Sequence, residues 1–241
     1  MIQLNLDSFS LGQKRILEKI NFQADQASLI NIVGPNGSGK TTLLKILAGL
    51  YKLQNGHLNF SVIDDKISFL SQKSELAEDI TINDYLRLAG FKVCKGQLGR
   101  FKKYLPEITS LMECLGLNHS LETSIGHLSG GEFQKWRIIA ATYWDPEVLL
   151  LDEPCSFLDP KHQDEILKLL KFFVHNKKKT VVIVSHDINQ VLNSMGQVFG
   201  LKKGQIVFSG FHEDFHNSSV LENLFDKKFN VTTVGEGRYA L

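Results

Sequence analysis

A glycine-rich segment in the first quarter of the chain has the residue types of a phosphate-binding loop. Residues 34–41 read Gly-Pro-Asn-Gly-Ser-Gly-Lys-Thr and follow the apolar run 29–33. Glycines let backbone N–H groups turn inward around an anion, and a helix that starts at the lysine adds its positive end. Lys40 would supply a positive charge at the terminal phosphates, and Thr41 a hydroxyl for Mg²⁺. The segment predicts a site for nucleotide phosphates, formed by Gly34, Pro35, Asn36, Gly37, Ser38, Gly39, Lys40, Thr41 and Thr42.

Two adjacent carboxylates follow a second apolar run. Residues 148–151 are aliphatic, and Asp152 and Glu153 come directly after them. We expect Asp152 to hold magnesium, and Glu153 to orient and deprotonate an attacking water. A polar strand end before a turn would look the same in isolation. The phosphate-binding loop favours the catalytic interpretation, because it already requires an acid that binds metal.

A third motif, Leu128-Ser129-Gly130-Gly131-Glu132, precedes a stretch with helical apolar spacing. Ser129 and Glu132 would form a capping box, and capping alone would account for both. Capping does not require two glycines between them. Bare backbone at the positive end of a helix suits the close approach of an anion, so Ser129, Gly130 and Gly131 are a second candidate phosphate site.

The elements that must position these residues follow an α/β pattern. The runs 29–33, 148–151 and 181–184 are short and apolar, and each ends in polar residues. Such runs are typical of strands buried on both faces of a parallel sheet, whose ligands lie beyond the carboxyl ends of the strands. The spacing becomes helical between about residues 76 and 121. We therefore predict an α/β core with an inserted helical subdomain.

The expected boundaries follow from these changes in pattern. The α/β core takes residues 1–73 and 146–241, and the helical subdomain takes about 74–145. Near the C-terminus we expect a hairpin over 201–210 that turns at Lys203 and Gly204, then a helix over 220–225 and a pair of strands. His212 and His216 are four residues apart, but no helix is evident there and metal binding is not expected.

Composition limits the class of protein. The 241 residues are 43% hydrophobic and 22% charged, with a net charge of +1. These are ordinary globular proportions, without a basic field that would attract nucleic acid. No apolar run approaches the roughly 18 residues of a membrane span. Three cysteines, an odd number, fit a reducing cytosol better than a disulfide framework.

Taken together, the motifs resemble those of the ATP-hydrolysing subunits of ABC transporters, over nearly the whole chain. The resemblance implies a P-loop NTPase α/β core with a mainly parallel sheet, an antiparallel β subdomain and an inserted helical subdomain, with ATP and Mg²⁺ as ligands. Residues 128–132 are similar to the family's signature motif. In the family, the signature motif of one subunit completes the nucleotide site of the other. Ser129, Gly130 and Gly131 would then contact ATP held by a second copy, in a head-to-tail dimer.

Other positions carry over one by one. Gln72 resembles the glutamine that contacts magnesium and the attacking water, although alone it would be an ordinary loop residue. His186 resembles the histidine at the γ-phosphate, although a histidine after a strand is more often structural. Residues 157–159 resemble the loop that makes contacts across the dimer, with Phe157 where a small residue is usual. The resemblance thus implies a catalytic set of Lys40, Gln72, Glu153 and His186, with Thr41, Gln72 and Asp152 at the metal.

One position departs from the family pattern. The family stacks adenine on an aromatic residue about 23 positions before the loop, where this chain has Leu11, with Phe9 two residues earlier. Either Phe9 substitutes for that aromatic residue, or adenine lies against an aliphatic surface. We expect ATP not to be strongly preferred over GTP.

The segment Asp159-Pro-Lys-His162-Gln163 resembles ATPases of importers for vitamin B12, ferric siderophores and haem, and so does the short ending 229–241. Alternatively, His162 and Gln163 merely open a surface helix over 164–173. The importer branch implies a peripheral protein at the cytoplasmic face of the inner (plasma) membrane, with a permease bound near residues 72–84 and no nucleic acid partner. An exporter subunit remains an alternative, as do a small-molecule kinase and a non-transport ATPase acting on ribosomes or DNA.

Overall fold

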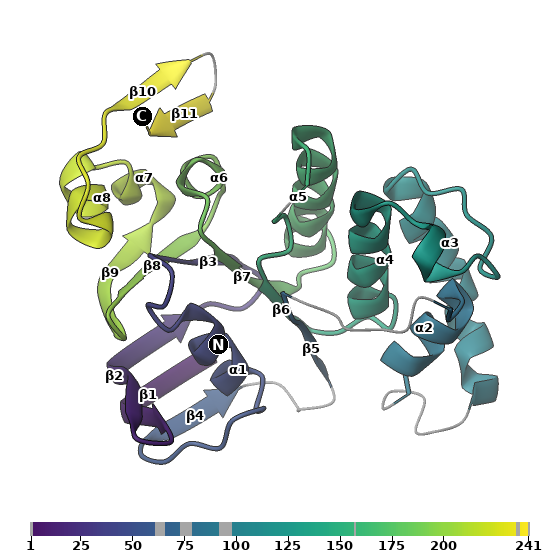
Figure 1. Cartoon of the computed structure of the whole chain (residues 1–241), viewed down its shortest axis with the longest axis horizontal. Helices are drawn as coiled ribbons and strands as arrows, with labels where there is room; N and C mark the ends of the chain where they lie inside the picture. Colours follow the sequence, from purple (N-terminus) through teal and green to yellow (C-terminus); the bar gives the residue numbers. More distant parts are fainter. Residues whose placement is uncertain are drawn as a thin grey trace.

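The computed structural model of the chain describes residues 2–60, 66–72, 79–91, 98–156, 158–234 and 237–240. A six-stranded sheet lies at its centre (Figure 1). In spatial order its strands are β5 (Ile67–Leu70), β6 (Val148–Asp152), β7 (Thr180–Ser185), β3 (Leu29–Val33), β8 (Gln197–Lys202) and β9 (Gln205–Phe211). The first five run parallel, and β9 pairs antiparallel at the edge. The predicted parallel sheet is confirmed, and so is the hairpin at Lys203 and Gly204.

Every residue of β3, β6 and β7 is buried, because the sheet is covered on both faces. Alternate side chains of β6 enter two different apolar clusters. Leu149 and Leu151 pack with the helical part of the chain, while Val148 and Leu150 pack with α1 (Lys40–Leu47). These strands therefore need apolar side chains on both faces of the sheet, and this explains the uninterrupted aliphatic runs.

A second, antiparallel sheet closes over α1. Its order is β2-β1-β4, with β1 (Ile2–Leu11), β2 (Lys14–Ala24) and β4 (His57–Phe60). The inward side chains of β1 and β2 share one cluster with Leu43, Leu44 and Leu47 of α1. α1 ends at Leu47, and Leu50 beyond it is 58% exposed.

The helical part lies beyond β5 and β6 (Figure 1). It contains α2 (Ile82–Ala89), the 3₁₀ helices η2 (Leu98–Tyr104) and η3 (Ile125–His127), α3 (Leu105–Cys114) and α4 (Gly130–Thr142). Trp136 of α4 is fully buried in the cluster that also holds Leu86 and Ile108. The helical expectation is confirmed for the described residues, and the chain divisions near 73 and 145 remain a proposal.

The C-terminal part follows β6. Its elements are α5 (Pro160–His175), α6 (Ile188–Leu192), α7 (His212–Phe215), α8 (Ser218–Phe225), β10 (Val231–Val234) and β11 (Gly237–Ala240). The predicted helix near 220–225 and the terminal strand pair are present. Two expectations are corrected. A helix does begin at His212, where an aspartate and a glutamate complement its first turn, and α5 begins at Pro160, because Asp159 caps it.

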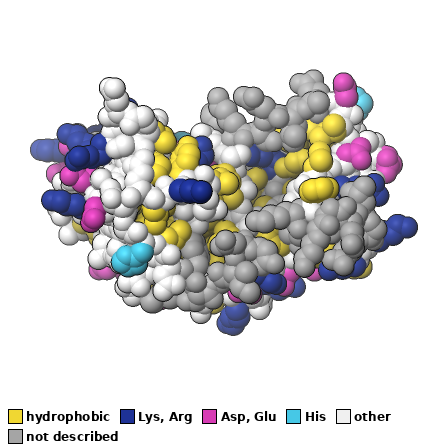
Figure 2. All heavy atoms as spheres, turned by 90° about the horizontal axis from the view of Figure 1, so that it is seen from below, with side chains coloured by type: hydrophobic (Ala, Val, Ile, Leu, Met, Phe, Trp, Pro, Cys, Tyr) yellow, Lys and Arg dark blue, Asp and Glu magenta, His cyan; other side chains and the backbone are white. Residues whose placement is uncertain are grey.

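Figure 2 shows charged side chains of both signs scattered over one face, with apolar side chains across its middle. Among the described helices, none is long and apolar enough to cross a membrane.

Candidate active site

The phosphate-binding loop (34–41) is built between β3 and α1 and is supported from the side. Gly37 and Gly39 have φ values of 76° and 106°, which favour glycine. A Cβ at Gly39 would also come within 2.7 Å of the Leu17 side chain. The β8–β9 turn braces the loop, since the Gly204 N–H donates to the Ser38 carbonyl at 3.0 Å. Contacts with β2 and with the β8–β9 turn thus support the shape of the loop.

Lys40 closes the loop on itself. Its Nζ donates to the carbonyl oxygens of Gly34 at 2.8 Å and Pro35 at 3.0 Å. Burial lowers the pKa of Lys40, and the nearby Glu153 and Asp152 oppose that shift. Hydrogen bonds to a charged oxygen are stronger than those to a neutral carbonyl. The ammonium is therefore placed to exchange its two carbonyl partners for phosphate oxygens.

Thr41 and Asp152 meet at the carboxyl end of β6. The Thr41 hydroxyl donates to Asp152 Oδ1 at 3.2 Å, and Asp152 is 2% exposed. Burial is the main cause that raises the pKa of Asp152, with the neighbouring Glu153 charge adding to it. A hydroxyl and a carboxylate are hard oxygen donors of the kind that Mg²⁺ prefers. These two residues fit a magnesium ion.

Three polar side chains contact the same oxygen of Glu153. Oε2 accepts from Gln72 Nε2 at 2.8 Å and from the Ser156 hydroxyl at 2.8 Å, and His186 Nδ1 lies 3.2 Å away. Glu153 has a left-handed backbone, with φ of 51°, and its N–H donates to Val184 on β7 at 3.0 Å. Two segments far apart in sequence, at Gln72 and His186, thus meet the Glu153–Ser156 turn at one carboxylate. Sequence reasoning missed Ser156, which only its place three residues after Glu153 could have indicated.

Most of these residues line one cleft of about 630 Å³. Its described walls are Lys14, Ile16, Asn36, Gly37, Gly39, Lys40, Thr41, Thr42, Gln72, Glu153 and His186. Asp152 lies behind Thr41, and the Ser38 hydroxyl is buried with no hydrogen-bond partner among the described residues. The loop, the metal pair and the glutamate cluster therefore form one site. Lys14 and Ile16 of β2 were not predicted, because nothing in the sequence links them to the loop.

Phe9 corrects the sequence-based expectation about the nucleotide base. It is 3% exposed and packs on Tyr51, with ring centroids 5.5 Å apart, inside the cluster around α1. Phe9 is not among the residues that line the cleft, and its burial disfavours the stacking alternative. The cleft wall contributed by β2 is Ile16 and the stem of Lys14, which leaves the aliphatic alternative.

The signature motif (128–132) lies away from this cleft, at the start of α4. The capping box is present, because the Ser129 hydroxyl accepts from the Glu132 N–H at 3.2 Å and Glu132 Oε2 accepts from the Ser129 N–H at 2.9 Å. The Ser129 hydroxyl also donates to Glu132 Oε2 at 2.7 Å, and this hydrogen bond, together with that from the Ser129 N–H, lowers the pKa of Glu132. Ser129, Gly130 and Gly131 line no part of the cleft. Within one chain, the phosphate-binding loop and the side chains around Glu153 share one cleft. The signature motif of the same chain lies outside that cleft.

Two further polar residues of α4 reach the cleft from behind, and sequence reasoning missed both. Gln134 Nε2 donates to the Pro154 carbonyl at 2.7 Å, next to Glu153. Arg137 donates to the carbonyl of Gln72 at 3.2 Å and to that of Ser71. Both side chains are nearly buried, so they need such partners. The signal was available, since long polar side chains interrupt an otherwise apolar helix.

Comparisons with known proteins agree with this arrangement. A family model described as ABC transporter matches residues 17–156. The chain is 31% identical to the petrobactin import ATP-binding protein YclP of Bacillus subtilis, over 99% of this chain and 98% of that protein. A structure of an inward-facing ABC transporter of the metal-chelate type superposes with a TM-score of 0.83 at 23% identity, over 99% of this chain and 95% of that one. The dimeric ATP-binding cassette MJ0796, bound to ADP and Pi, superposes with a TM-score of 0.74 at 26% identity. The match covers 88% of this chain and 99% of that one.

Proposed function

The chain belongs to the ABC transporter family as its ATP-binding, ATP-hydrolysing subunit, and from this premise we propose that it powers import of a metal chelate or cobalamin-type substrate. The end-to-end match to a protein named for petrobactin import supports the import branch. The His162-Gln163 pair of the sequence supports it independently. We place the protein at the cytoplasmic face of the membrane, bound to a permease and without a nucleic acid partner.

The observation that carries the hydrolytic role is the convergence of Gln72, Glu153 and His186 at the mouth of the phosphate-binding loop. In this proposal Glu153 accepts the proton of a water that attacks the γ-phosphate in line. The Gln72 amide orients the Glu153 carboxylate and the attacking water. Lys40 and His186 would balance the charge that develops on the phosphate. Bound Mg²⁺ would neutralise phosphate oxygens, and Thr41, Asp152 and Gln72 would hold it.

A second copy would complete the site. Cassettes of this family act as dimers, and we propose the head-to-tail arrangement for this chain. Its support is the separation of the signature motif from the cleft, together with the open space on the Cβ side of Gly130, where nothing lies within 4 Å. The positive end of α4 would then face the γ-phosphate of ATP bound to the partner.

The permease would bind the helical part near residues 72–84. Leu76 and Ala77, two apolar residues of this stretch, lie outside the described residues. Ile80 is half-buried and packs against the cluster that contains Trp136. A force applied at this surface would reach Gln72 directly, because Arg137 of α4 holds the backbone of Gln72.

Glu153→Gln tests the hydrolytic role. The variant should bind ATP and accumulate as an ATP-bound dimer, while turnover falls by about 10²–10⁴-fold, the usual contribution of a general base. ATPase rates and sedimentation with and without ATP measure both. Glu147→Gln is the matched control, because this exposed glutamate lies at the opposite end of β6.

Turnover of Glu153→Gln at the wild-type rate would show that another group is the base. The import role has its own readout in the source organism. Cells that carry only the Glu153→Gln allele should lose uptake of a radiolabelled ferric siderophore or of cobalamin, and retain it with Glu147→Gln. Unchanged uptake of both compounds would contradict the proposed class of substrate.

A further inference from the structure

The first turn of α5 touches the signature motif of the same chain. A Cβ added at Gly131 would meet His162 Nδ1 at 3.2 Å and two further ring atoms at 3.4 Å. Three ring atoms at nearly equal distance mean that the imidazole presents its face to the glycine. At Gly130 an added Cβ would meet nothing within 4 Å. The two glycines therefore differ: the Cβ side of Gly130 is open, and that of Gly131 is filled by His162.

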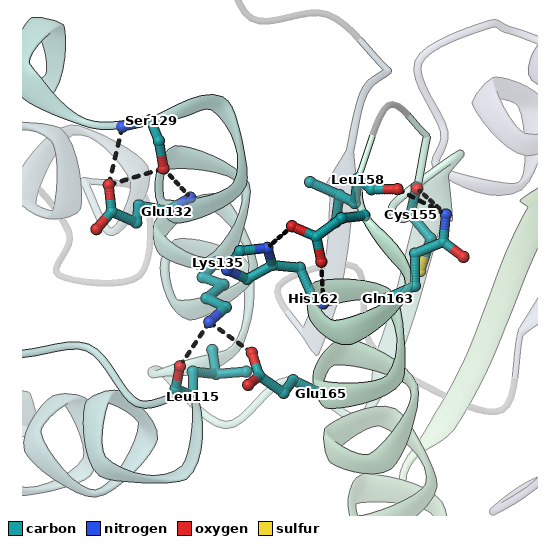
Figure 3. A network of polar contacts seen from close by, with 10 residues as sticks. Leu115, Ser129, Glu132, Lys135, Cys155, Leu158, His162, Gln163 and Glu165 are labelled. Carbon is teal, nitrogen blue, oxygen red and sulfur yellow. Dashed lines mark hydrogen bonds and ion pairs between the residues drawn. The ribbon is translucent and has the colours of Figure 1, made fainter.

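Asp159 fixes the orientation of the His162 ring (Figure 3). It caps α5 by accepting from the His162 N–H at 3.0 Å, and its other oxygen accepts from His162 Nδ1 at 2.7 Å. These hydrogen bonds hold the pKa of Asp159 below its usual range. The ring cannot turn away from Gly131 without breaking its contact with Asp159.

Gln163, the next residue, fastens the segment between Glu153 and α5. Its Nε2 donates to the carbonyls of Leu158 at 3.0 Å and Cys155 at 3.4 Å (Figure 3). Ser156 of that segment donates to the Glu153 carboxylate. Adjacent residues of one helical turn thus contact the signature motif on one side and the segment that follows Glu153 on the other.

An ion pair keeps the two helices together behind this contact. Lys135 of α4 lies 2.5 Å from Glu165 of α5, and it also donates to the Leu115 carbonyl at 2.9 Å (Figure 3). Lys135 is 5% exposed, so the pair is poorly screened by solvent. A displacement at the start of α4 would therefore reach α5 instead of being absorbed between the helices.

We infer that His162 is a positioning residue, which couples the signature motif of a subunit to the 153–159 segment of that same subunit. The inference rests on the proposed function. In the head-to-tail dimer, Gly131 lies on the partner's ATP while Glu153 serves the subunit's own ATP. Closure of the signature motif on one nucleotide would press on His162, and through Asp159 and Gln163 would set the position of Glu153 at the other.

A double-mutant cycle tests the contact. Gly131→Ala must displace the His162 ring by a few tenths of an ångström, so we expect ATP turnover to fall by about tenfold or more. His162→Ala makes room for the new methyl group. The double variant Gly131→Ala/His162→Ala should therefore turn over ATP about fivefold faster than Gly131→Ala alone, a coupling in the usual range for residues in contact. No such recovery is expected when Gly130→Ala is combined with His162→Ala.

His175→Ala is the matched control, because His175 is an exposed histidine at the last position of the same helix. It should give no recovery with Gly131→Ala. The melting temperature and the affinity of the monomer for ATP separate misfolding from mispositioning, and both should stay near wild type in all variants. ATP-dependent dimerisation is measured for each variant with Glu153→Gln added.

The outcomes separate the inference from the proposed function. If Glu153→Gln dimerises with ATP but the Gly131 and His162 effects simply multiply, the inference is wrong and the proposed function stands. The same holds if Gly130→Ala is rescued as well as Gly131→Ala. If ATP produces no dimer of Glu153→Gln, the proposed function fails and the inference fails with it.

Discussion

At the scale of single residues, the backbone of Glu153 determines how two adjacent carboxylates take different tasks. A left-handed conformation at a non-glycine residue costs about 1–3 kcal/mol and persists only where its surroundings enforce it. Here the hydrogen bond from the Glu153 N–H to Val184 contributes to that restraint. As a result Asp152 points to Thr41, while Glu153 points to Gln72 and His186. The sequence predicts two divergent carboxylates, but not the strained backbone that separates them.

Phe9→Ala is the prediction that belongs to this scale. Because the Phe9 ring is buried against Tyr51, its removal should cost about 3–5 kcal/mol of unfolding free energy, measured by urea denaturation. It should not change the ratio of ATP to GTP affinity. We expect that ratio to be below about tenfold in the wild type too, since Ile16 and Lys14 form an aliphatic wall with few groups that could distinguish the bases.

Competition between ATP and GTP for a fluorescent nucleotide measures the ratio in wild type and variant. Phe9→Leu serves as control, because it retains the apolar volume and loses the ring. A large preference for ATP that disappears in both variants would restore Phe9 as the residue that stacks on adenine.

At the scale of elements, α4 connects parts of the site that lie on different segments. Its N-terminus carries Ser129, its second turn holds the backbones of Pro154 and Gln72 through Gln134 and Arg137, and Lys135 binds α5. A helix buried on almost every side can accommodate these polar groups only because each finds a partner. Burial thus makes α4 a rigid connector.

Glu165→Gln tests this rigidity. The amide oxygen can still accept from Lys135 but carries no charge to balance the buried ammonium, and we expect a loss of about 2 kcal/mol of unfolding free energy. The double variant Lys135→Met/Glu165→Leu should lose less, because it leaves no buried charge unpaired. A larger loss in the double variant than in Glu165→Gln would show that packing, and not charge pairing, dominates at this junction.

The pH dependence of that loss has a defined sign. The hydrogen bond from Lys135 is the main cause that lowers the pKa of Glu165 from its ordinary value of 4.5. The folded state thus binds the Glu165 proton more weakly than the unfolded chain, so the stabilisation is complete above pH 4.5 and disappears as pH falls through the lowered pKa. The difference between wild type and Glu165→Gln should therefore be constant near neutral pH and shrink below about pH 4.

Patterns local in the chain were predictable, and contacts between distant segments were not. The strands at 29–33, 148–151 and 181–184 can be predicted from the sequence, because burial on both faces requires unbroken apolar runs. The phosphate-binding loop is predictable because glycine spacing and backbone shape are local. Ile16 enters the site only through packing between segments, which no spacing rule records. The burial of Phe9 could not be predicted from alternation, because the inward positions of β1 shift by one residue between Leu6 and Phe9.

At the scale of the whole molecule, the fold divides the proposed catalytic groups between two surfaces. The carboxyl ends of β3, β6 and β7 bring Lys40, Glu153 and His186 to one cleft, as parallel strands do with whatever follows them. Ser129 begins α4 on the helical side of β5 and β6 (Figure 1). If the proposed dimer is right, each intact site needs Glu153 from one subunit and Ser129 from the other.

Mixing two inactive variants tests this division. Ser129→Ala and Glu153→Gln should each hydrolyse little ATP alone. In a mixed dimer, one site combines the intact Glu153 of the first variant with the intact Ser129 of the second, and the other site has neither. A 1:1 mixture forms mixed dimers half of the time, so it should regain about a quarter of wild-type activity if the two sites fire independently.

The control places both substitutions in one chain and mixes it 1:1 with wild type. The same numbers of altered residues are then present, but every mixed dimer has two sites that each lack one group, so the mixed dimers should be inactive. Wild-type dimers, a quarter of the total, keep full activity, so a head-to-tail dimer predicts about a quarter of wild-type activity for this mixture as well. No activity in the first mixture and about half of the wild-type activity in the second would mean that Ser129 and Glu153 of one chain serve the same nucleotide, which the separation of α4 from the cleft makes unfavourable within a single subunit.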